Sequence, residues 1–216
     1  MKNLLLFLAL LVPMTSFAQA GTPFARAYKL GEKTTYHVTH VVKFMGTHSM
    51  SIDIQLTAAK LLDKGRAELG VHWSNLQKDA DDETAMPNDF SFKTAANNLP
   101  DHFAITQGST TFYALFLMLA SATADKPVTV GDEIPINWDG ADGNLAFKGT
   151  IKILEISAEK TRLKALVKVK TTLGGQDAGE FALTSTYDTT DGSLVQSVGA
   201  FTVAGNAQEF TFTRKS

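Results

Sequence analysis

The sequence predicts a mainly β fold, in which a curved antiparallel meander forms an open or half-closed barrel wrapped on one apolar helix near residues 110–122. Two observations predict this fold. Most of the chain beyond residue 30 alternates apolar and polar residues with a period of two, which is typical of strands with one buried face. The exception is the run FYALFLMLASA at 112–122, which has no polar stripe and must be buried on all sides.

The first 20 residues have the pattern of a signal peptide. Lys2 precedes an apolar run at 4–11, and Ala18 and Ala20 are spaced as in an Ala-x-Ala cleavage site. We expect cleavage after Ala20, which would leave a single β-rich domain over 21–216 in the periplasm or outside the cell. The chain contains no Cys, so disulfides do not contribute to its stability. No membrane span is expected after cleavage, because a spanning helix needs about 20 apolar residues.

Three strands are predicted to open the domain, at residues 34–44, 50–57 and 67–74. Each alternates large apolar residues with polar ones. Short turns at 45–47 and 63–65 separate them, and both contain the Gly that tight turns favour. These three segments therefore predict consecutive antiparallel strands.

The middle of the chain predicts a loop and then the helix. Residues 77–98 are polar and acidic with little periodicity, which indicates a loop with one short strand, and 99–106 adds another short strand. Residues 108–111, with the sequence GSTT, supply N-cap candidates for the apolar helix. We expect the helix to end before Pro127, because proline disfavours the helical conformation in the residue that precedes it.

The remaining chain alternates strands with tight turns and so continues the meander. Its clearest strand is 162–172, in which Leu163 and Val167 lie on an apolar face opposite Lys164 and Lys168. A change of phase near 153–154 predicts a bulge. The predicted strands cover residues 133–138, 145–156, 162–172, 181–187, 194–203 and 210–212.

Two short matches raise the hypothesis of an internal repeat, with halves at about 30–75 and 130–172. The entry segment LGEK at 30–33 matches VGDE at 130–133, and the later turns DKGR and EKTR also match. Shared turn chemistry explains matches this short as well as duplication does.

The mature chain contains no motif that identifies a reaction. Gly-x-Ser-x-Gly, Ser-x-x-Lys and glycine-rich phosphate loops are missing, and the lack of Cys excludes a thiol enzyme. We therefore expect no enzyme, no catalytic residue and no cofactor. The formal net charge of -2 lacks the basic excess that nucleic acid requires, so no nucleic-acid partner is expected.

The sequence also predicts no metal site. His37 and His72 lie on the polar faces of neighbouring predicted strands and could approach each other, but we interpret them as surface imidazoles. The acidic runs at 79–83 and 139–144 contain oxygen ligands for Ca²⁺ but lack EF-hand spacing, since Thr150 stands where the bidentate Glu would be. We interpret both as solvated loops.

A basic stripe marks the outward face of the predicted strands at 145–156 and 162–172. Its cations could attract anionic head groups, although we interpret them as a solvated face because Glu155, Glu159 and Glu180 lie close in sequence. The stripe consists of Lys148, Lys152, Arg162, Lys164, Lys168 and Lys170.

A signal peptide, a long meander and one apolar helix between two strand groups resemble the open-barrel architecture of periplasmic lipoprotein carriers and outer-membrane lipoprotein receptors. The Gly-acid turns at 31–32 and 131–132 and the closing segment at 188–194, DTTDGSL, are similar to secreted bacterial β-sheet proteins of uncharacterised function. The first resemblance implies an unclosed barrel whose concave apolar face holds acyl chains under helical lids. This chain departs from it by offering a single helix.

These observations lead to two functional hypotheses for a non-enzymatic periplasmic or secreted protein. In the first, the concave face binds an apolar or lipid-like small molecule, with Phe112, Phe116 and Met118 as ligand-lining residues. In the second, the protein is a structural or interaction factor of the cell envelope, its core is filled by the helix, and its partner is another envelope protein. A cavity beside the helix would favour the first hypothesis, and a filled interior the second.

Overall fold

The structure is a computed structural model that describes residues 21–43, 46–79, 86–95, 99–101, 110–121, 124, 126–140, 145–203 and 206–215. For residues 110–114, 121, 202, 203 and 206 it describes the backbone alone. The predicted signal peptide lies outside the described residues.

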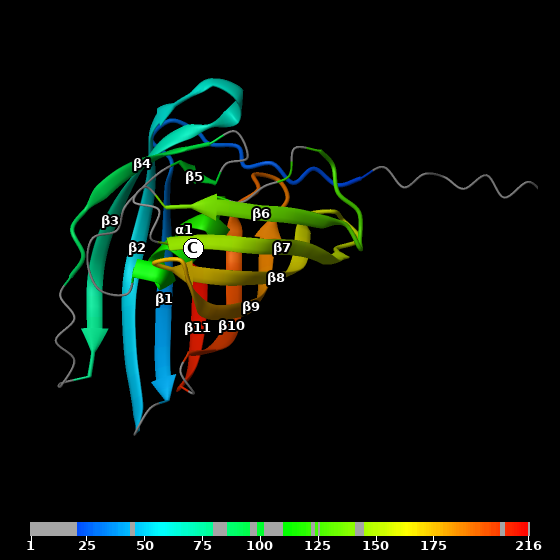
Figure 1. Cartoon of the computed structure of the whole chain (residues 1–216). Helices are drawn as coiled ribbons and strands as arrows, with labels where there is room; N and C mark the ends of the chain where they lie inside the picture. The colour runs from blue at the N-terminus through cyan, green and yellow to red at the C-terminus, as the bar shows by residue number, and fades with distance from the viewer. Residues whose placement is uncertain are drawn as a thin grey trace, which may run out of the picture.

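One antiparallel sheet of 11 strands makes up most of the molecule, which confirms the predicted fold class. The sheet is curved and not closed, and β1 to β3 run across the direction of β6 to β8 (Figure 1). Its strand order is β5-β4-β3-β2-β1-β11-β10-β9-β8-β7-β6. The strands are β1 (Lys33–Lys43), β2 (Thr47–Leu61), β3 (Ala67–Lys78), β4 (Phe90–Thr94), β5 (Pro100–Asp101), β6 (Glu133–Asp139), β7 (Leu145–Ile156), β8 (Arg162–Leu173), β9 (Gln176–Asp188), β10 (Leu194–Val203) and β11 (Asn206–Arg214).

The first and last strands lie side by side in the middle of this order. β1 pairs with β2 on one side and with β11 on the other, and Tyr36 lies opposite Arg214. The two hairpin series therefore extend outward from a central seam formed by the two ends of the described chain.

The outermost strands of the order, β5 and β6, are joined by a side chain. Trp138 Nε1 on β6 donates a hydrogen bond of 2.7 Å to the carbonyl oxygen of Pro100 on β5, and this bond is buried. The sheet thus curves until its two edges meet, with no ladder of backbone hydrogen bonds between them in the described part of the chain.

Local features of the strands follow the residue pattern. Leu163 and Val167 on β8 are fully buried, as their alternation predicts. The register between β7 and β8 shifts between Ile153 and Glu155, so the predicted bulge is confirmed. β3 continues to Lys78, beyond the predicted end of this strand, because it pairs with the long β2 as far as Met50.

Helix α1 (Thr110–Ser121) lies inside the curve of the sheet (Figure 1). The side chains from Leu115 to Leu119 have no exposed surface. The ring of Phe116 lies 5.1 Å from the ring of Tyr36 on β1 and 5.1 Å from that of Phe212 on β11, measured between centroids. The helix therefore packs against the central seam. In the described part of the chain, no helix combines the length and apolar character needed to cross a bilayer.

A segment over 21–28, which we call the strap, crosses one end of the sheet. Thr22 pairs with Val128 just before β6, and the backbone N–H of Ala27 bonds to the carbonyl of Asp191 before β10. Phe24 is buried and its ring lies 4.9 Å from that of Tyr187 on β9. The strap was not among the predicted elements, although its residues alternate between buried and exposed.

The two Gly-acid entry turns have the same local structure. Gly31 and Gly131 both have positive φ, of 76° and 95°. Gly31 donates its N–H to the carbonyl oxygen of Ala58 on β2, and Gly131 donates to that of Ile153 on β7. Each glycine is followed by an acid whose carboxylate accepts the N–H of the residue three before it. Duplication of the two halves stays a hypothesis, but the turns that suggested it are equivalent in hydrogen bonding.

Candidate functional site at the strapped rim

We call the end of the sheet crossed by the strap the strapped rim. β1 and β6 begin there, each after its entry turn, and the strap runs from Val128 beside β6 to the start of β1. Because neighbouring strands are antiparallel, the connections β2–β3, β7–β8 and β9–β10 lie at the same rim. This rim therefore brings together segments from both halves of the chain.

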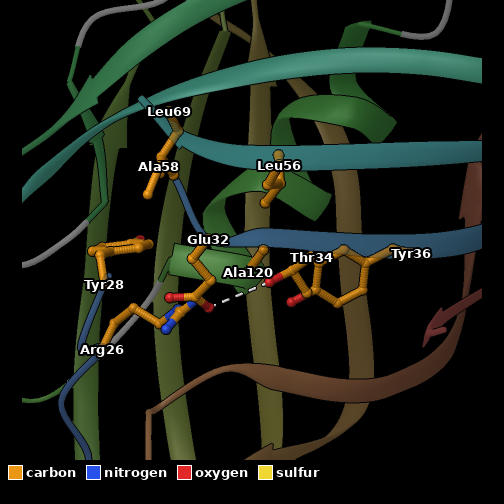
Figure 2. Close-up of a pocket in the computed structure, with 9 residues that line it drawn as sticks. All are labelled: Arg26, Tyr28, Glu32, Thr34, Tyr36, Leu56, Ala58, Leu69 and Ala120. Atoms are coloured by element: carbon orange, nitrogen blue, oxygen red, sulfur yellow. Dashed lines mark hydrogen bonds and ion pairs between the residues drawn. The ribbon is translucent and has the colours of Figure 1, made fainter. Parts of the chain in front are cut away.

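A buried arginine from the strap lines a pocket at this rim, shown in Figure 2. The side chain of Arg26 is 5% exposed and its Nη2 donates a 2.7 Å hydrogen bond to Glu32 Oε1. Its Nη1 donates to the carbonyl oxygens of Ala27 and Asp191, and its guanidinium lies 4.4 Å from the ring centroid of Tyr28. Strap, entry turn and the β9–β10 connection thus meet on one cation.

The floor of the Arg26 pocket is apolar and reaches the end of α1. Ala120 of the helix contributes to it, and the pocket lies above the fully buried ring of Tyr36. The complete lining consists of Arg26, Tyr28, Glu32, Thr34, Tyr36, Leu56, Ala58, Leu69 and Ala120. The pocket is therefore the place where the polar rim meets the hollow that holds the helix.

Electrostatics keep the arginine charged and the tyrosine neutral. Burial alone would lower the pKa of Arg26, but the hydrogen bond to Glu32, together with the charge interactions with Tyr28, Glu32 and Tyr36, outweighs this and the pKa is raised. Burial raises the pKa of Tyr36 as well, because a phenolate would lack solvation there. The pocket thus holds one permanent ion pair above a neutral floor.

The free space in the Arg26 pocket is about 10 Å³, close to what one water molecule needs. The carboxylate of Glu32 is already paired with the guanidinium of Arg26, so an anionic ligand would have to displace Glu32. Two larger depressions lie elsewhere, of about 130 Å³ beside Val128 and about 330 Å³ on the surface near Phe92. Neither is lined by Phe116 or Met118.

The predicted ligand-lining residues lie on α1. Phe116 and Met118 are fully buried, and Phe116 packs against the rings of the central seam. The side chain of Phe112 lies outside the described part of the structure. With α1 in this position, a ligand would reach Phe116 only if the helix moved, so the ligand-lining role stays a prediction.

A second polar cluster, on the outer face of the sheet, was missed by the sequence reasoning. Asp53 on β2 is buried and accepts hydrogen bonds from His37 Nδ1 at 2.9 Å, Asn75 Nδ2 at 2.6 Å and Lys215 Nζ at 2.6 Å. Burial would raise the pKa of Asp53, but these three donors together lower it to about 2. The cluster ties the end of the chain to β1, β2 and β3.

The other candidate residues are dispersed. His37 and His72 do not meet, because β2 separates their strands and each pairs with its own carboxylate, Asp53 and Asp89 respectively. In the acidic run at 79–83, Asp79 accepts the N–H of Ser49, and the rest lies outside the described residues. Of the run at 139–144, residues 141–144 lie outside them too.

The basic stripe lies on the outward face of β7 and β8. Lys148 is directly opposite Lys170, and Lys152 pairs with Glu133 at 3.3 Å. Arg162 contacts Asp188 at 2.6 Å. These neighbours leave the stripe mixed in charge, in keeping with its interpretation as a solvated face.

No model of a known protein family matches the chain, and no curated protein sequence matches it.

Proposed function

We propose that this chain is a non-enzymatic periplasmic or secreted protein of the cell envelope, which acts through contacts at its surface. The observation that carries the proposal is the burial of α1. A helix that is apolar on every side occupies the concave face, and its side chains from Leu115 to Leu119 have no exposed surface. The surface that remains for function is the outside of the sheet and its rims.

The size of the Arg26 pocket supports the same proposal. Binding sites for small organic ligands typically enclose about 300–1,000 Å³. The pocket that reaches α1 has about 10 Å³ of free space. The two charged side chains that line it, Arg26 and Glu32, pair with each other. A filled interior of this kind stabilises the sheet, because one face of an isolated curved sheet would expose its apolar residues to water.

Native mass spectrometry and solvent extraction of the purified mature protein test the proposal. The expected mass is that of the polypeptide alone, with no lipid in the extract. Phe116→Ala provides the matched positive control, because it removes a large ring from the same interior and leaves an apolar cavity that small apolar probes can enter. A stoichiometric lipid in the wild-type protein would overturn the proposal.

A second candidate function is carriage of an apolar or lipid-like molecule on the concave face. One observation favours it: α1 has no charged side chain, and the rings around Phe116 would be equally suitable neighbours for an acyl chain. The ligand would have to replace the helix. Hydrogen exchange separates the two functions, since added fatty acid would accelerate amide exchange in residues 115–120 only if the helix gives way.

A further inference from the structure

One corner of the strapped rim combines exposed leucines with a group of cations. Leu30 at the tip of the first entry turn is 69% exposed, and Leu61 at the end of β2 is 46% exposed. The two segments are joined, because Gly31 donates its N–H to the carbonyl of Ala58 and Ala58 donates to that of Glu32. We call this the basic corner; its cations are Lys29, Lys33, Lys60, Lys64 and Arg66.

Few carboxylates balance these cations. Glu32 is occupied by the buried Arg26, which leaves Asp63 and the half-buried Glu68 as the nearby acids. Lys29, Lys33, Lys60 and Lys64 have no carboxylate of the described residues within ion-pair distance. A concentrated positive field thus lies on a protein whose formal net charge is -2.

The second entry turn has the same backbone and a different surrounding charge. Val130 occupies the place of Leu30 and is 60% exposed. The exposed residues near it include Glu133, Glu155 and Glu159 as well as Lys160, and Glu133 already pairs with Lys152. The backbone that the two entry turns share therefore accounts for an exposed apolar residue at the tip of each. It does not account for the lysines that surround Leu30 at the first turn.

We propose that the basic corner docks on an anionic lipid surface, with Leu30 and Leu61 in the interface and the lysines over the phosphate groups. Apolar tips flanked by cations are the combination that interfacial binding uses. Four of the five cations are lysines, whose flexible point charges suit a fluid layer of head groups better than the fixed geometry of a protein carboxylate. The proposal names an anionic lipid surface as the partner for the surface contact proposed above. It rests on the proposed function only for the location of the protein in the cell envelope.

Vesicle flotation with the mature chain tests the docking. The probe is phosphatidylcholine vesicles with and without phosphatidylglycerol. Wild-type protein is expected to float with the anionic vesicles and to be released as salt rises. The variant Lys29→Gln/Lys60→Gln/Lys64→Gln is expected to bind about 100-fold more weakly, and Leu30→Ser about tenfold more weakly.

Two matched controls locate the effect. Lys148→Gln/Lys168→Gln/Lys170→Gln removes the same charge from the outward face of β7 and β8, where these lysines also have no ion pair with a carboxylate of the described residues. Val130→Ser changes the equivalent tip of the second turn. Both are expected to bind anionic vesicles like the wild-type protein. All of these positions are exposed, so circular dichroism should show the fold unchanged.

The proposal fails if wild-type protein does not float with anionic vesicles, or if the control triple variant weakens binding as much as the corner variant does. Envelope protein captured through the corner, without vesicle binding, would also overturn it and assign the corner to a protein partner. Neither result bears on whether the interior holds a lipid, which the mass measurement decides separately.

Discussion

Trp138 on β6 and Pro100 on β5 are joined by a 2.7 Å hydrogen bond between the indole N–H and the backbone carbonyl oxygen. These strands are the two ends of the sheet order, and among the described residues no ladder pairs them. This buried hydrogen bond therefore links the two edge strands of the open sheet. Trp138 also stacks at 5.3 Å on Phe147 of β7, which fixes the indole in position.

Trp138→Phe tests this bond. The ring still fills most of the space, but the carbonyl of Pro100 loses its donor, so the free energy of unfolding should fall by about 1–3 kcal/mol. Urea unfolding followed by circular dichroism measures the change. Leu173→Ala, at an exposed position on β8, should change it by less than about 0.5 kcal/mol. Equal stability of Trp138→Phe and wild type would show that packing alone holds the two edge strands together.

Phe116→Ala is expected to be the most destabilising change in α1. The ring is fully buried between Tyr36 and Phe212, so its removal leaves a cavity and should cost about 3–5 kcal/mol. Thermal and urea unfolding measure this loss. A cost below about 1 kcal/mol would mean that the helix does not pack in the hollow as described.

Asp53→Asn tests the outer cluster through its pH dependence. The pKa of Asp53 is about 2 in the folded protein against 3.8 for an ordinary Asp, so the ionised carboxylate stabilises the fold above about pH 4. This contribution, about 2 kcal/mol, is lost as the pH falls from about 4 to about 2. The variant should thus be less stable than wild type at pH 7 and equally stable near pH 2. A difference that is independent of pH would contradict the charge-based explanation.

The Arg26–Glu32 pair predicts an asymmetry between its two partners. Glu32→Gln leaves a buried guanidinium without its carboxylate and should cost about 2–3 kcal/mol. Arg26→Met keeps the apolar stem and leaves Glu32, which is 23% exposed, partly accessible to water, so it should cost less. Urea unfolding of both variants checks the order. The reverse order would show that Arg26 acts mainly through its packing.

Gly192→Ala tests how tightly the strap is held. Gly192 has a φ of 69°, and a Cβ at this position would lie 2.4 Å from the carbonyl oxygen of Ala25. The substitution should push the strap from the β9–β10 connection and accelerate amide exchange at Ala27, which bonds to Asp191. Gly174→Ala has positive φ but nothing within 4 Å, so it controls for backbone strain alone. Equal exchange at Ala27 in both variants would contradict a close fit of the strap.

The strands could be predicted from local pattern because one face of each is buried. The alternation of Leu163, Ala165, Val167 and Val169 and the change of phase at Ile153 are signals that a few consecutive residues carry on their own. The apolar helix was also predictable from a local pattern, since a run of residues without a polar stripe must be enclosed.

Pairing and buried charge could not be predicted in this way. The contact between β1 and β11 joins residues from opposite ends of the chain, and no local pattern encodes it. Asp53 stands in an outward position of an alternating strand, so it appears solvated until Lys215 and Asn75 are brought to it by the fold. Arg26 appears exposed in the sequence because its carboxylate and carbonyl partners come from separate turns.

The central position of β1 and β11 determines when the molecule can be completed. β1 is the first strand of the described sheet in chain order, and its partner β11 is the last. The seam on which α1 packs thus cannot form until every strand of the described sheet has been synthesised. Contacts between distant segments slow folding and leave apolar strands accessible meanwhile. Until both strands are available, the chain should therefore expose extended apolar segments of the kind that chaperones bind.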